Sequence, residues 1–114
     1  MEKINYADIA HCPVTTTIEI IGGKWKILVL YLISNDINRF GKMSMMLKGI
    51  SKQMLTSQLR ELEENGIIER KIYAEIPPRV EYFLTPTGKS LLPIILMMKD
   101  WGLQYTKEQE KVVA

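Results

Sequence analysis

The fold of this chain is decided by residues 39–84, RFGKMSMMLKGISKQMLTSQLRELEENGIIERKIYAEIPPRVEYFL. Apolar residues at helical spacing predict a short helix over residues 40–47. Lys48-Gly49-Ile50 predicts a turn after it, because glycine readily adopts the left-handed conformation that such turns need. Ser51 is a good N-cap for the next helix, which Asn65-Gly66 should end. Two helices joined by a tight turn therefore come first.

The stretch continues with two segments rich in β-forming residues, 67–73 and 80–84. Pro77-Pro78 lies between them, at the tip formed by residues 75–79. The two prolines remove two backbone donors and fix two φ angles, so this tip should be stiff. Arg79 should make it basic. This order predicts a winged helix-turn-helix, a mainly α fold with a small β-hairpin (α+β). DNA binding is therefore the first hypothesis.

The second helix of this stretch has one apolar and one polar side. Leu55, Leu59 and Leu62 should form its buried stripe. The other side carries polar residues spaced i, i+3, i+4 and i+7, which therefore project together toward base edges or phosphates. We predict that DNA is contacted by Arg39, Lys48, Ser51, Lys52, Gln53, Thr56, Ser57, Arg60 and, from the hairpin, Arg79. The alternative for these residues is an ordinary solvated surface.

Charge along this stretch is divided sharply, although the net charge of the chain is only +2. Residues 37–60 contain five basic residues and no acidic one, whereas residues 61–69 contain four acidic residues and no basic one. This pattern suits a helix whose first half approaches phosphate while its second half points away.

The flanking segments predict further helices. Pro13 suits the first position of a helix that runs to about Ile21, and Gly22-Gly23 should separate it from a more buried helix over residues 24–34. Thr85-Pro86 repeats the pattern of an N-cap and a first-position proline, and predicts one long last helix in which Pro93 causes a kink or a restart.

The size and composition fit one soluble domain. The chain has 114 residues, of which 46% are hydrophobic and 25% charged, and its apolar runs are too short to span a bilayer. We expect a cytoplasmic protein without a signal peptide. No catalytic constellation and no phosphate loop occurs, so we expect neither an enzyme nor a cofactor, and one cysteine with one histidine makes no metal site.

That single cysteine, Cys12, directly precedes Pro13 and should lie at a helix N-cap. The helix dipole would lower its pKa there and favour the thiolate that a redox or electrophile sensor needs. The alternative is an inert, buried thiol.

The last helix carries more apolar side chains than a domain of this size can bury. Residues 91–98 are apolar around the whole circumference apart from Pro93, which indicates burial on every side. A second subunit would cover them, and we predict a homodimer interface built from Ile18, Leu91, Leu92, Ile95, Met98 and Trp101. A helix lying on a membrane surface is disfavoured, because the cationic face is nearly absent.

The chain resembles HxlR-type transcriptional regulators. The matching motifs, in order from residue 12 to residue 102, are Cys12-Pro13, Ile20-Ile21-Gly22-Gly23-Lys24-Trp25-Lys26, Arg39-Phe40, Gly49-Ile50-Ser51, Met54-Leu55-Thr56, Leu59-Arg60-Glu61-Leu62-Glu63, Pro77-Pro78-Arg79-Val80-Glu81-Tyr82, Leu84-Thr85-Pro86, Gly88 and Trp101-Gly102. The resemblance implies a winged-helix homodimer on a palindromic operator, joined through its N-terminal and C-terminal helices. It also implies that Cys12 occupies the position through which some members sense quinones, aldehydes or oxidants.

We therefore expect a homodimeric DNA-binding regulator with an N-terminal arm (1–12), a winged helix-turn-helix (13–90) and a C-terminal dimerisation helix (91–114), all in one structural domain. Its partners would be double-stranded DNA, a second copy of the chain and an oxidant or small-molecule inducer, without a membrane. Two alternatives stay open. One is a regulator with a ligand pocket at the dimer interface and no thiol switch, and the other is a winged-helix module that binds protein.

Overall fold

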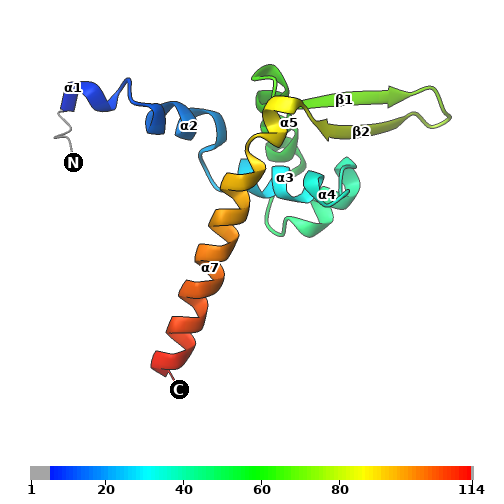
Figure 1. Cartoon of the computed structure of the whole chain (residues 1–114). Helices are drawn as coiled ribbons and strands as arrows, with labels where there is room; N and C mark the ends of the chain where they lie inside the picture. The colour runs from blue at the N-terminus through cyan, green and yellow to red at the C-terminus, as the bar shows by residue number, and fades with distance from the viewer. Residues whose placement is uncertain (1–5, 114) are drawn as a thin grey trace.

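A computed structural model describes residues 6–113 of the chain, and the parts of the predicted arm and last helix at residues 1–5 and 114 lie outside it. Its elements follow the order α1 (Tyr6–Ile9), α2 (Pro13–Ile21), α3 (Trp25–Ser34), α4 (Phe40–Met46), α5 (Lys52–Glu64), β1 (Ile68–Tyr73), β2 (Arg79–Leu84), α6 (Pro86–Lys89) and α7 (Leu92–Val113). Figure 1 shows α3, α4 and α5 gathered in a body from which the hairpin projects. The predicted α+β winged helix-turn-helix is confirmed.

Local chemistry sets the limits of the helix-turn-helix, as predicted. Gly49 has a φ of +92° in the turn between α4 and α5, a conformation that glycine adopts at little cost. Ser51 caps α5 by accepting a hydrogen bond from the Met54 N–H at 3.0 Å. Gly66 follows the end of α5 with a φ of +70°.

The core lies between α3, α4, α5 and the start of the hairpin. Its largest fully buried side chains are Val29, Leu30, Met43, Leu55, Leu62 and Ile68. Leu55, Leu59 and Leu62 form the buried stripe of α5, as its spacing predicted. Since these leucines fix the rotation of α5, they also decide which of its side chains face outward.

The β1–β2 hairpin, called the wing below, pairs antiparallel with Ile68 opposite Leu84 and Tyr73 opposite Arg79. The Tyr82 N–H donates to the Asn38 carbonyl at 3.0 Å, which ties β2 to the segment just before α4. The wing is therefore attached to the body on both strands, because β1 continues directly from α5.

The restart predicted at Pro93 is confirmed, since α7 begins at Leu92, whereas the expected continuity of the last helix from Thr85 is wrong, because α6 ends at Lys89. Thr85 caps α6 by accepting from the Gly88 N–H at 3.0 Å, and its hydroxyl lies within hydrogen-bond distance of the Gly66 and Ile67 carbonyls. A Cβ on Gly88 would lie 2.1 Å from the Ile67 carbonyl oxygen, so α6 sits tightly against the base of the wing. The chain then turns, and α7 restarts around Pro93.

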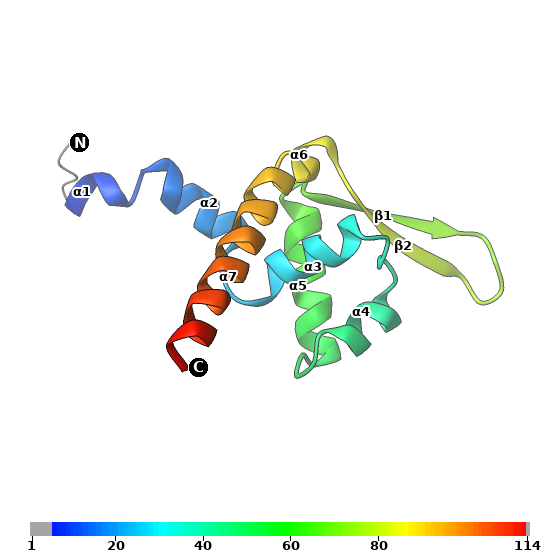
Figure 2. The same ribbon diagram turned by 60° about the horizontal axis from the view of Figure 1, so that its bottom comes forward.

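The molecule is extended. The radius of gyration is 17.1 Å, whereas a compact chain of this length has about 13 Å. In Figures 1 and 2, α7 crosses α3 and leaves the body, and α1 and α2 lead away on the side opposite to the wing. Among the described residues, no helix is long and apolar enough to cross a membrane.

Candidate nucleic-acid interface

The outer face of α5 presents the predicted DNA-contacting residues together. Its buried leucines turn Lys52, Gln53, Ser57 and Arg60 outward, and all four side chains are exposed. Ser51 is exposed at the N-cap, and Lys48 is exposed in the turn just before it. The helix-turn-helix therefore gathers six of the predicted residues on one short helix and the turn that precedes it.

The two halves of α5 use their charges differently. In the second half, Glu61 binds the Lys26 ammonium at 2.9 Å, and Glu63 lies 3.6 Å from the Arg70 guanidinium. Lys48 in the turn and Lys52 and Arg60 on α5, all before Glu61, have no ion-pair partner among residues 6–113. Glu61 and Glu63 thus tie α5 to α3 and β1, while the basic residues before them keep their charge for a partner.

The hydroxyl groups of α5 differ in what they can offer DNA. Thr56 donates to the Lys52 carbonyl at 2.8 Å and is half-buried, so its proton is already used within the helix. Ser51 accepts at the N-cap and keeps its own proton free. Ser57 and Ser51 are therefore better phosphate donors than Thr56, which is left to offer its methyl group.

The wing arginine is engaged within the protein. The Arg79 guanidinium lies 3.3 Å from Glu75, 3.5 Å from Glu81 and 3.9 Å from the centre of the Tyr73 ring. Because Glu75 pairs with Arg79, the tip is not the basic finger that the sequence suggested. Arg39, also predicted to contact DNA, pairs with Glu81 at 3.5 Å and keeps 56% of its side chain exposed.

Cys12 occupies the N-cap of α2, as predicted, and its side chain is partly exposed. The nearby backbone N–H of Thr15 is the main cause that lowers the pKa of the Cys12 thiol; burial opposes it, and the Val14 N–H and the Thr15 hydroxyl add smaller lowering effects. The Thr15 hydroxyl lies 3.9 Å from Sγ and also bonds the Ile9 carbonyl. Folding therefore favours the thiolate at this position.

The residues predicted for a dimer contact divide into three groups. Ile18, Met98 and Trp101 are 60%, 51% and 69% exposed, so they present apolar surface away from the body. Leu91 and Leu92 are half-buried against the core. The prediction that Ile95 contacts a second subunit is wrong, because its side chain is 3% exposed and packs within its own chain.

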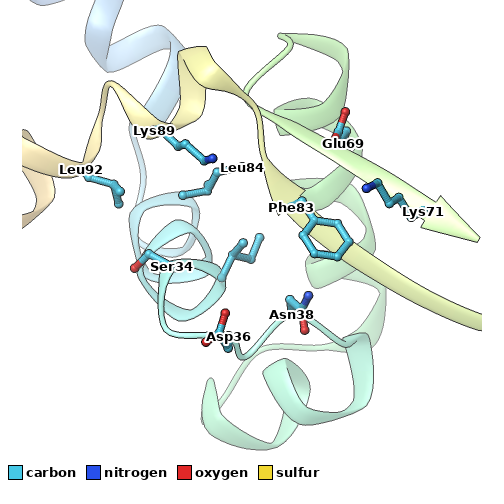
Figure 3. Close-up of a pocket in the computed structure, with 10 residues that line it drawn as sticks. Ser34, Asp36, Asn38, Glu69, Lys71, Phe83, Leu84, Lys89 and Leu92 are labelled. Atoms are coloured by element: carbon cyan, nitrogen blue, oxygen red, sulfur yellow. The ribbon is translucent and has the colours of Figure 1, made fainter.

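Two of the hollows on the described surface lie beside α3. One of about 470 Å³ lies between the end of α3, the wing and α6, and Figure 3 shows Asp36, Glu69, Lys71 and Lys89 placed around Phe83. The other, of about 290 Å³, is almost wholly apolar and lies between Tyr31 of α3 and Met98 of α7. In the part of the chain that the structure describes, no three histidine, cysteine or acidic side chains are grouped to hold a metal ion.

Comparison with known proteins agrees with this geometry. Residues 20–110 match the model of the HxlR-like helix-turn-helix family. The chain belongs to this family. An HTH-type transcriptional regulator of Bacillus subtilis, YdeP, is 48% identical over 107 residues, which are 94% of this chain and 84% of that protein.

Solved structures agree with the same assignment. The redox regulator HypR in its oxidised form has a TM-score of 0.77 and 47% identity over 82% of this chain and 96% of its own. HypR in its reduced form has a TM-score of 0.79 and 44% identity over 88% of this chain and 99% of its own. The resemblance seen in the sequence is thus confirmed, and the chain is an HxlR-like, DNA-binding transcriptional regulator.

One set of residues in this HxlR-like regulator is absent from the predicted site. Glu81 lies two residues after Arg79 on the same side of β2, and Tyr73 lies opposite Arg79 on β1. Strand periodicity and hairpin register were the pattern that could have found the group.

Proposed function

We propose that this regulator binds its operator as a homodimer, with residues 51–65 of each protomer in successive major grooves. The two half-sites would be about one helical turn, or a multiple of it, apart. The observation that carries the proposal is that Lys48, Lys52 and Arg60 have no ion-pair partner within residues 6–113, whereas Glu61 and Glu63 of the same helix are paired within the chain. Residues 13–90 would form the DNA-binding part, residues 1–12 an arm and residues 91–114 the dimerisation helix.

The apolar surface of α7 supports the dimer. Ile94, Met97, Trp101 and Tyr105 follow one another at helical spacing and are 41%, 71%, 69% and 49% exposed. Trp101 and Tyr105 stack with their ring centres 5.2 Å apart and thereby form a flat apolar surface. Burying each large side chain contributes ~1.5–3 kcal/mol, so a few such residues from each chain would sustain association.

We also propose that Cys12 senses oxidants or electrophiles. The lowered pKa and the partial exposure of the thiol support this role, as does the likeness to HypR, a redox regulator. With one cysteine in the chain, no internal disulfide can form. Diamide would join the Cys12 sulfurs of two subunits and take up their two protons and two electrons at its N=N bond, whereas a quinone would add to a single thiolate.

A DNA-binding titration tests both proposals. Wild type and Cys12→Ser would be titrated onto the upstream region of the gene, with and without diamide. We expect salt-dependent, saturable binding by both proteins, and release by diamide of the wild type alone. Salt-independent or absent binding would contradict the operator proposal and favour a protein-interaction module. Release of Cys12→Ser by diamide or a quinone would contradict the thiol mechanism.

A second candidate mechanism is a small-molecule inducer without thiol chemistry. The apolar hollow of about 290 Å³ between α3 and α7 favours it, because it lies beside the surface proposed for dimer contact. Leu28 lines this hollow and is not among the residues predicted for the dimer contact. An apolar inducer that releases Cys12→Ser as readily as the wild type, but does not release Leu28→Lys, would support this mechanism.

A further inference from the structure

The carboxylate of Glu81 holds two arginines that come from different parts of the fold. Its Oε2 lies 3.5 Å from Nε of Arg39, the N-cap residue of α4, and its Oε1 lies 3.5 Å from Nη1 of Arg79 in the wing. The side chain of Glu81 is only 16% exposed, so both ion pairs are partly shielded from water. One side chain therefore links the helix-turn-helix to the wing.

The wing end of this link, Arg79, makes several contacts within the hairpin. Arg79 contacts Glu81, Glu75 and the face of the Tyr73 ring at once, and its Nε is buried without a hydrogen-bond partner among the described residues. A guanidinium held on three sides is poorly placed to leave for a DNA groove, because every contact would have to break. Its geometry instead suits a structural role, because its guanidinium connects Glu75 at the tip of the wing with Glu81 on β2.

Two neighbouring contacts join the start of α4 to β2, the Arg39–Glu81 ion pair and a backbone hydrogen bond. Asn38, next to Arg39, accepts the backbone hydrogen bond from Tyr82, next to Glu81. That backbone bond and the buried Ile68 hold the base of the hairpin, and the Arg39–Glu81 ion pair adds a side-chain contact one residue nearer the tip, which Arg79 extends along β2. Lys71 lies opposite Glu81 in the register, but its ammonium sits 4.9 Å above the Phe83 ring and has no ion pair with Glu81.

We propose that Glu81 is a positioning residue, which sets the angle of the wing against α5 so that both reach the same DNA duplex. This inference rests on the proposed DNA-binding function. Met43 of α4 and Leu55 of α5 are buried in the same core, so the two helices are held together there. A wing fixed to the start of α4 is therefore also fixed relative to α5. Without the carboxylate, Arg39 and Arg79 repel one another and the outer part of the hairpin loses its side-chain contact with the start of α4, so its angle against α5 is less firmly set.

The test compares Glu81→Gln with Glu69→Gln. Both variants remove one negative charge from the same hairpin, but the Glu69 carboxylate is exposed and has no ion pair within residues 6–113. Operator affinity would be measured by fluorescence anisotropy over a range of salt, together with hydroxyl-radical footprints. For Glu81→Gln we expect lower affinity, a smaller salt slope and loss of the flanking protection given by the wings, with the major-groove protection retained.

The control and the rescue make the outcome decisive. Glu69→Gln should bind at least as tightly as the wild type, because its net charge rises without loss of a link, and Glu81→Asp should restore part of the flanking protection. If Glu81→Gln does not fold, as judged by thermal melting, the exchanged pair Arg39→Glu with Glu81→Arg must regain the flanking protection that Arg39→Glu alone loses, which loss of a direct contact between Arg39 and DNA would not allow. A full wing footprint and unchanged affinity in Glu81→Gln would overturn this inference and leave the DNA-binding proposal standing, whereas failure of the wild type to bind would overturn both.

Discussion

Lys48 provides the most direct test of how α5 and its turn meet DNA. Its ammonium is exposed and unpaired within the described residues, beside the N-cap of α5, where a phosphate would lie if the helix enters the major groove. Each neutralised phosphate contributes about −0.9 to the slope of log K against log salt, and a dimer carries Lys48 twice. Lys48→Ala should therefore make the slope shallower by about 1.8.

The measurement is an anisotropy titration on the operator at several salt concentrations. Between 50 and 200 mM salt, the factor by which operator affinity falls should be about twelvefold smaller for Lys48→Ala than for the wild type. The preference of the variant among DNA sequences should stay the same. Lys107→Ala is the matched control, since it removes an exposed lysine near the far end of α7. Equal slopes for the wild type and Lys48→Ala would refute the placement of the turn against the DNA backbone.

Other perturbations test the remaining parts of the molecule. Arg60→Ala should weaken operator binding by ~1–3 kcal/mol and relax preference at one base pair if it reads a guanine, which a gel-shift series on operator variants would measure. Leu55→Ala should lower the free energy of unfolding by ~2–5 kcal/mol in urea titrations, because Leu55 is fully buried. Trp101→Glu should give a folded monomer in light scattering, since Trp101 is 69% exposed; a dimer of unchanged affinity would contradict the α7 interface. The lowered pKa of Cys12 should let iodoacetamide alkylate the folded protein at a lower pH than the unfolded chain, and coinciding pH profiles would count against an activated thiol.

Features that depend on a few neighbouring residues were predictable. The Ser51 cap, the left-handed Gly49 and the stripe of Leu55, Leu59 and Leu62 all matched, because caps, turns and amphipathic spacing act within one or two turns of chain. Cys12 at the N-cap of α2 followed in the same way from its place before Pro13. Local signatures of this kind also placed the two strands to within one residue at each end.

Features that depend on distant contacts were not predictable. The cap of Thr85 looked like the start of a long helix, but α6 ends at Lys89 because Thr85 and Gly88 hold it against Gly66 and Ile67, about twenty residues earlier. In the same way, α3 is apolar on all sides, so its spacing alone did not single out Val29 and Ile33 for burial.

The sequence by itself determined the order of the elements as far as β2, the face of α5 on which the predicted DNA-contacting residues lie and the place of the single thiol, because each follows from short-range periodicity and charge. Tertiary packing settled which charges remain available. It paired Glu61 with Lys26 and enclosed Arg79 between Glu75, Glu81 and Tyr73, while Lys48, Lys52 and Arg60 were left without ion pairs within residues 6–113. Ion pairs form between groups a few ångströms apart in space, so a pattern along the chain shows where charges stand but not which of them the fold neutralises.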